Sequence, residues 1–241
     1  MRKVGIKTYP DKKEYFEKIR GHCDAIELMA APDIDIDFYS KFEQKFFLHA
    51  PHCHFGVNLA NPEREEFSIK MMKHAIKVAD ALNAEFIVVH AGYEETPKST
   101  LKQACKVLKE VWDERMLIEN EPGWIEPDIR NHAFCKVEET KEIMEETGLG
   151  MCLDIAHAAC SAALQGADHV EYNKRFMELK PKYFHFCDGI VGQPYDSHLH
   201  FGKGNLDLNK IKAMVPEDLW VTIETWHDFE EQLSDIEFLK A

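Results

Sequence analysis

The feature that most constrains the fold of this chain is a regular alternation of short apolar runs with amphipathic segments. Eight runs rich in Val, Ile, Leu and Phe have the length of buried strands and are too short for typical globular helices. Their hydrophobicity is continuous rather than alternating, which is typical of parallel strands covered on both faces. They span residues 4–9, 25–30, 46–50, 86–91, 116–121, 151–156, 183–188 and 220–225.

The segments between these runs are predicted to be helical. In residues 63–83, apolar side chains recur at spacings of three and four and so share one face. Similar segments span residues 99–112, 136–147, 168–179, 207–214 and 228–240. Strands and helices in this order predict an α/β fold, a single (β/α)8 TIM-barrel domain over residues 1–241. The alternative is an open doubly wound sheet, but the first run lacks the glycine-rich phosphate fingerprint of that fold.

The composition argues against a membrane, secreted or disulfide-rich protein and against general binding of nucleic acid. No apolar stretch approaches the roughly 18 residues of a membrane helix and no signal peptide is evident, so we expect a cytoplasmic protein without a membrane partner. Seven cysteines without a CxxC pair argue against a disulfide framework or a zinc knuckle, and we interpret Cys152 and Cys187 as small buried thiols. A formal charge of −14 is unfavourable for general nucleic-acid binding, although carboxylates that hold metal ions contribute to it.

Imidazoles and carboxylates stand at the ends of six of the runs. In a barrel these ends converge on the face where active sites form. Packing does not explain them, because buried polar groups are costly when unpaired. A bound cation would offset their repulsion, and a mixture of His and carboxylates suits Zn, Mn or Fe better than Ca or Mg. These residues are His49, His90, Glu119, Asp154, His185 and Glu224.

Further histidines extend this set. His157 follows Asp154 by three residues at the turn after the sixth run, where it either faces the same site or caps the start of a helix. His52 and His54 crowd next to His49, and either can replace or assist it as a metal ligand.

Two tryptophans and one glutamate are candidates for weaker roles. Trp124 and Trp226 follow the fifth and eighth runs, where they can stack on a sugar ring or a base, or simply cover the barrel mouth. Glu27 ends the second run and either faces the pocket or makes a structural ion pair.

Several motifs together resemble the xylose-isomerase-like barrel superfamily, which includes endonuclease IV (AP endonuclease family 2) and sugar isomerases and epimerases. They are VVHAG (88–92), LIEN (117–120), CLDIAH (152–157), FHFCD (184–188), DSHLHFGKGN (196–205) and TIET (222–225).

The resemblance to endonuclease IV implies three zinc ions. The first would be held by His90, Glu119 and either His49 or His52. The second would share Glu119 and add Asp154, His185 and Glu224. The third would be held by His157, Asp196 and His198.

The isomerase and epimerase branch implies a simpler site. One divalent ion, Mn or Mg included, would be held by Glu119, Asp154, His185 and Glu224, with the two glutamates as the catalytic acid/base pair.

Our first hypothesis is therefore a multinuclear, zinc-type hydrolase of a phosphoester, either abasic-site DNA as in DNA repair or a smaller phosphoester. A one-metal sugar or sugar-phosphate isomerase or epimerase is the alternative. Lys203 lies within a Gly-Lys-Gly that replaces the family's commoner Gly-Glu-Gly, where it would contact a phosphate or only keep its loop soluble.

The sequence gives less information on large partners. We find no stripe of basic residues that would bind along a DNA backbone. An exposed barrel rim would allow a homodimer.

Overall fold

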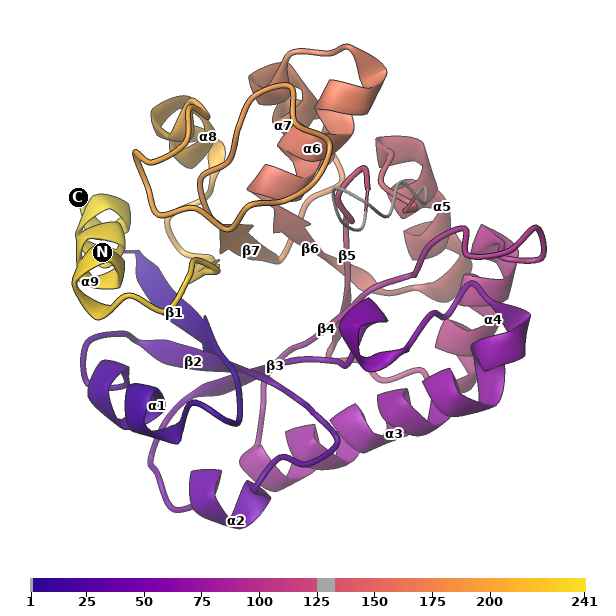
Figure 1. Cartoon of the computed structure of the whole chain (residues 1–241), viewed down its shortest axis with the longest axis horizontal. Helices are drawn as coiled ribbons and strands as arrows, with labels where there is room; N and C mark the ends of the chain where they lie inside the picture. The colour runs from indigo at the N-terminus through magenta and orange to yellow at the C-terminus, as the bar shows by residue number, and fades with distance from the viewer. Residues whose placement is uncertain (1, 125–132) are drawn as a thin grey trace.

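Eight parallel strands close into a barrel in which each strand pairs with the next along the chain and β8 pairs with β1 (Figure 1). The computed structural model describes residues 2–124 and 133–241. The strands are β1 (Lys3–Thr8), β2 (Ala25–Met29), β3 (Phe46–His49), β4 (Ile87–Val89), β5 (Met116–Glu119), β6 (Gly150–Asp154), β7 (Tyr183–Phe186) and β8 (Trp220–Ile223). The predicted TIM barrel is confirmed, and the open doubly wound sheet is excluded.

Helices surround the strands (Figure 1). They are α1 (Lys13–Ile19), α2 (Ile36–Tyr39), α3 (Glu65–Leu82), α4 (Leu101–Glu110), α5 (Val137–Thr147), α6 (Ile155–Gln165), α7 (His169–Met177), α8 (Leu208–Met214) and α9 (Phe229–Lys240), with short 3-10 turns η1 (Cys53–Phe55) and η2 (Pro62–Arg64). The six predicted helical segments correspond to α3, α4, α5, α7, α8 and α9. None of the helices within residues 2–124 and 133–241 is long and apolar enough to cross a membrane.

The sixth strand ends at Asp154, as predicted, and the last two residues of its apolar run, Ile155 and Ala156, belong to α6. The Asp154 side chain accepts a hydrogen bond from the backbone N–H of His157, which makes it the N-cap of this helix. His157 therefore lies in the first helical turn rather than in a loop.

The barrel interior has an apolar lower layer and a polar upper layer. The lower layer consists of Ala25, Phe47, Val88, Leu117, Cys152 and Tyr183. Side chains two residues apart along a strand point to the same face, so the next inward residue on each of these strands lies directly above. On β5 this step leads from Leu117 to Glu119, and on β7 from Tyr183 to His185. The strand period therefore places a polar ring at the carboxyl end of the barrel.

Candidate metal centre

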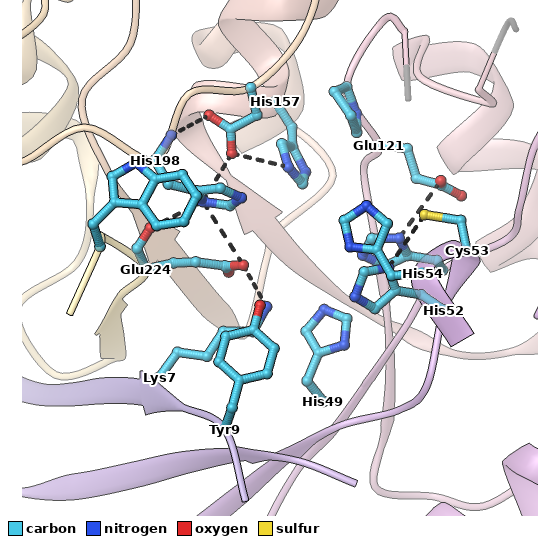
Figure 2. Close-up of a pocket in the computed structure, with 14 residues that line it drawn as sticks. Lys7, Tyr9, His49, His52, Cys53, His54, Glu121, His157, His198 and Glu224 are labelled. Atoms are coloured by element: carbon cyan, nitrogen blue, oxygen red, sulfur yellow. Dashed lines mark hydrogen bonds and ion pairs between the residues drawn. The ribbon is translucent and has the colours of Figure 1, made fainter. Parts of the chain in front are cut away.

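A pocket of about 220 Å³ opens at the carboxyl end of the barrel (Figure 2). Its lining residues come from loops and strand ends that are far apart in the sequence. They are Lys7, Tyr9, His49, His52, Cys53, His54, His90, Glu121, Pro122, His157, Asp196, His198, Glu224 and Trp226.

The first group of potential ligands is built around one carboxylate oxygen of Glu119. Oε2 of Glu119 lies 2.8 Å from Nε2 of His90 and 3.2 Å from Nε2 of His49. His52 lines the same pocket, with its ring 5.0 Å from that of His90, but its Nδ1 faces Sγ of Cys53 at 3.3 Å. Of the two alternatives His49 and His52, His49 is the one that contacts Glu119.

The second group uses the other oxygen of Glu119. Oε1 of Glu119 lies 2.9 Å from Nδ1 of His185, and the same nitrogen lies 2.9 Å from Oε2 of Glu224. Asp154 completes a set of four buried residues whose ligand atoms all lie within 4.8 Å of one another. Oδ2 of Asp154 is buried and has no hydrogen-bond partner among the described residues.

The third group centres on Asp196. Its Oδ2 lies 3.4 Å from Nε2 of His157 and 3.1 Å from Nδ1 of His198 (Figure 2). The structure divides these contacts between two overlapping clusters. One contains Asp154, His157 and Asp196, and the other contains Cys187, Asp196 and His198.

Several of the histidines are oriented by a partner on their second ring nitrogen. Nδ1 of His49 lies 2.9 Å from the carbonyl of Ala50, and Nδ1 of His157 lies 2.9 Å from the carbonyl of Asn120. Because a carbonyl only accepts, these nitrogens carry the proton and Nε2 is left as the lone-pair donor. Such a second contact is typical of metal-binding histidines.

Glu27 holds His185 in the same manner. Its Oε2 lies 2.8 Å from Nε2 of His185 and accepts a hydrogen bond from the Tyr183 hydroxyl at 2.7 Å. Glu27 is fully buried in the middle of β2 rather than at its end. The ion-pair interpretation of this residue is the one the structure supports.

Burial and neighbouring charges shift the pKa values of the carboxylates in this site. Burial raises the pKa of Asp154 to about 6, and the nearby Asp196 and Glu119 add to this rise against the effect of His157. Burial also opposes ionisation of Glu119, but the adjacent His185, His49 and His90 outweigh it and lower the pKa of Glu119 well below its usual value. A divalent cation would relieve this crowding.

Sequence reasoning missed Lys7 and Tyr9, which lie at the end of β1 and line the pocket. The Lys7 ammonium donates a hydrogen bond to Oε1 of Glu224 and lies 4.0 Å from Oε1 of Glu27. Burial would lower the pKa of Lys7, but Glu224 and the other acidic groups raise it, so the side chain is a buried cation. The available signal was a lysine inside an otherwise apolar strand.

Two of the three predicted substrate-binding residues lie outside the pocket. Lys203 pairs with Glu231 on the surface, at 3.1 Å between Nζ and Oε1. Trp124 is not among the residues that line the pocket, and its backbone N–H donates to the carbonyl of Pro194 at 2.7 Å. Trp226 does line the pocket and is 63% exposed at its mouth.

Lys203 lies outside the pocket because its loop folds onto the protein itself. The N–H groups of Gly202 and Gly204 donate to Oδ2 of Asp188 at 2.9 and 3.0 Å. A Cβ at Gly204 would lie 2.2 Å from the carbonyl oxygen of Gly189. The glycines therefore permit close approach to a carboxylate of this chain rather than to a bound group.

The fold is a TIM barrel with a polar site at the carboxyl end of its strands, and the chain belongs to the xylose isomerase-like TIM barrel family, which matches residues 22–241. The family is enzymatic, with endonucleases and epimerases among the proteins that resemble this chain. A probable endonuclease 4 of Aquifex aeolicus (strain VF5) is 28% identical over 206 residues, which cover 78% of this chain and 71% of that protein.

Solved structures show the same fold at lower identity. A D-tagatose 3-epimerase-like protein has a TM-score of 0.75 at 23% identity, covering 100% of this chain and 96% of the other. Endonuclease IV from Thermus thermophilus has a TM-score of 0.72 at 20% identity, covering 99% of this chain and 97% of the other.

Proposed function

We propose that this protein is a metal-dependent hydrolase that cleaves a phosphoester at a multinuclear, zinc-type centre. The observation that carries the proposal is the position of Glu119, whose two carboxylate oxygens face two different groups of ligands. Oε2 faces His49 and His90, and Oε1 faces His185. A carboxylate in this position is suited to bridge two ions. A one-metal isomerase would need only the second group.

The ligand sets of the proposed centre are as follows. The first ion would be held by His49, His90 and Glu119, the second by Glu119, Asp154, His185 and Glu224, and the third by His157, Asp196 and His198, with His52 as the alternative to His49. Imidazoles with a fixed second nitrogen, together with the unpartnered Oδ2 of Asp154, fit zinc best, with manganese or magnesium as alternatives. When bound, the ions would polarise the phosphoester and activate water.

The remaining pocket residues would bind and orient the substrate. Lys7 places a buried positive charge beside Glu224, where it can hold an anionic oxygen. Trp226 presents an exposed indole at the mouth, fixed by a hydrogen bond of 3.0 Å from Nε1 to the carbonyl of Ser197. A formal charge of −14 opposes the approach of a DNA backbone. A small phosphoester is therefore favoured over abasic DNA.

The direct test compares three substrates with the zinc-loaded protein: a chromogenic phosphodiester, a duplex with one abasic site, and ketoses in heavy water. We expect phosphodiester cleavage without exchange of ketose protons. Asp196→Asn should abolish cleavage, while Asp218→Asn, an exposed control, should not. Proton exchange without cleavage would contradict the hydrolase.

The isomerase or epimerase remains as a second candidate on one observation. Glu119 and Glu224, from β5 and β8, approach the same Nδ1 of His185 at 2.9 Å each, so two carboxylates flank one ligand position. This arrangement suits an acid/base pair that moves a proton next to a carbonyl. Such an enzyme would tolerate loss of His90 and Asp196, which lie outside that ligand set.

A further inference from the structure

We propose that the thiol of Cys187 is an additional ligand of the ion at Asp196 and His198, so that this ion position is selective for zinc over manganese and magnesium. The inference rests on the proposed metal centre. It adds a sulfur ligand to a site otherwise built from imidazole and carboxylate.

The geometry fits shared coordination. Cys187 directly follows β7 and is fully buried, with Sγ 3.7 and 3.9 Å from the two carboxylate oxygens of Asp196. Ligand atoms of Cys187, Asp196 and His198 all lie within 4.8 Å of one another. An oxygen and a sulfur on one tetrahedral zinc ion stand roughly 3.5 Å apart, for bonds of about 2.0 and 2.3 Å. The observed separation is close to that value.

Cys187 packs in the apolar core of the barrel, but its sulfur also lies next to charged groups, which a packing role does not require. Asp196, Asp154 and Glu224 all lie close enough to interact electrostatically with its sulfur. Asp154 is fully buried, and its Oδ2 has no partner among the described residues. The adjoining cluster of Asp154, His157 and Asp196, which shares Asp196 with the Cys187 cluster, therefore contains an acceptor that a bound cation would satisfy. A thiol that served only as a small apolar filler would be replaceable by Ala or Val.

The imidazole of His198 is held toward the same cluster. His198 adopts a φ of 47°, a left-handed conformation that is uncommon for a residue other than glycine. Its Nδ1 lies 3.0 Å from the carbonyl of Glu224. The same Nδ1 lies 3.1 Å from Oδ2 of Asp196, so the two contacts fix the ring beside Asp196.

Binding of the ion by the Cys187 thiol is a simple ligand exchange. Ion binding forms a metal–sulfur bond and releases the thiol proton to solvent, with no change in oxidation state. Thiolate is a soft ligand that favours zinc, whereas manganese and magnesium favour oxygen ligands. The other two proposed positions, whose assigned ligands are imidazoles and carboxylates, would then exchange their ions more readily than this one.

Cobalt(II) is the probe that tests this inference, because thiolate ligation gives it an intense near-ultraviolet charge-transfer band that nitrogen and oxygen ligands do not. The metal-free full-length protein would be titrated with Co²⁺ and its absorption recorded. We expect the band in the native protein and its loss in Cys187→Ser, which keeps a small hydroxyl donor. The zinc affinity of one site should fall at least about tenfold in the same variant.

Cys105→Ser, on α4 outside the barrel, is the control and should keep the band. Cys152 is the competing thiol, because its sulfur lies within 4.8 Å of potential ligand atoms of Glu119 and His185. Loss of the band in Cys152→Ser rather than in Cys187→Ser would overturn the inference. Unfolding curves of all variants would show that each is folded. A band that persists in Cys187→Ser, or Co²⁺ that binds without any band, would overturn the inference; so would failure of the protein to bind Co²⁺.

The inference and the proposed function can fail separately. A protein that shows the cysteine-dependent band but cleaves no phosphoester would retain the Cys187 ligand and lose the hydrolase. A protein that cleaves phosphoesters without the band would retain the hydrolase and lose the thiolate.

Discussion

Glu224 lies between the proposed metal ligands and the ammonium group of Lys7. It accepts a hydrogen bond from Lys7, and its other oxygen lies 2.9 Å from His185. Burial opposes its ionisation, but Lys7 and His185 outweigh this and lower its pKa well below the usual range. The carboxylate is therefore charged throughout the physiological range and can bind a cation at any such pH.

We expect Glu224→Gln to lose activity by at least about 100-fold, because an amide neither ligates an ion as an anion nor exchanges a proton. Thermal unfolding should show that the fold is intact. The matched control is Glu217→Gln, an exposed residue in the loop before β8. Full activity in Glu224→Gln would mean that the site is wrongly assigned under either proposed reaction.

Lys7 provides the second prediction at this scale. Lys7→Met keeps much of the side-chain volume and removes the charge, so inorganic phosphate should bind the zinc-loaded protein roughly 10- to 100-fold more weakly. Titration calorimetry measures the change. Lys3→Met, at the exposed start of the same strand, is the control. Equal phosphate affinity in the two variants would exclude Lys7 as an anion ligand.

At the scale of elements, β6 and α6 meet at Asp154, which caps the helix with Oδ1 and leaves Oδ2 toward the proposed ions. Asn is as good an N-cap as Asp, whereas Ala caps poorly. Metal-free Asp154→Ala should therefore unfold about 1 kcal/mol more easily than Asp154→Asn, measured with urea. Both variants should bind fewer zinc ions than the native protein. Equal stability of the two variants would argue against the cap.

The loops after β3 and β4 are joined by Glu95. This carboxylate accepts hydrogen bonds from Arg64 and Asn61, at 2.7 Å to Arg64 Nε and 2.8 Å to Asn61 Nδ2. Its contact with Arg64 lowers the pKa of Glu95 from 4.5 to about 2. The unfolded chain therefore binds more protons than the folded chain between these values, and the stability that Glu95 contributes is complete above about pH 4.5.

The contribution of Glu95 to the free energy of unfolding should depend on pH. Glu95→Gln should lower the free energy of unfolding at pH 7 by roughly 1 kcal/mol, a value reduced because Arg64 is 40% exposed. The difference from the native protein should shrink as pH falls from 4.5 toward 2. Urea unfolding of the metal-free proteins measures it, with the exposed neighbour Glu94→Gln as control. A difference that does not change with pH would contradict the assigned pair.

The sequence predicted those helices and strands whose own residues show a clear hydrophobic pattern. Eight apolar runs identified the strands, and α3 was evident from its apolar face. The helix α6 was missed because it follows Asp154 without a glycine or proline, and its alanine-rich start looks like a continuation of β6. The short helices α1 and α2 carry too few turns to show a period.

The sequence identified site residues most readily where a polar side chain ends an apolar run. Residues that terminate a run, such as His49 and Glu119, were identified because they interrupt an apolar pattern, and the structure brings them together. Lys7 and Glu27 lie within runs and were missed or misplaced. The sequence left two roles open for Lys203, because the contacts of its loop with Asp188 depend on tertiary structure, which local sequence does not contain.

At the scale of the whole molecule, the barrel concentrates acidic groups in a buried layer while the chain as a whole carries a formal charge of −14. Divalent ions that bind only the folded state would stabilise it. At ion concentrations of about 100 times Kd, one site contributes about 2.7 kcal/mol. For a chain of this size, chelation should lower Tm by roughly 5–10 °C.

Calorimetry of the zinc-loaded protein, the chelated protein and the chelated protein with zinc restored tests this expectation. Restoring zinc should recover the original Tm, while magnesium at the same concentration should recover little of it. Unchanged Tm after chelation would show that the folded state holds no tightly bound ion.

The central claim is that Glu119 joins two ligand groups into a multinuclear centre. The most direct measurement is the number of metal ions per chain in the purified protein, determined by inductively coupled plasma mass spectrometry. We predict two or three zinc ions per chain. A single manganese or magnesium ion per chain would contradict the multinuclear centre and favour the one-metal isomerase.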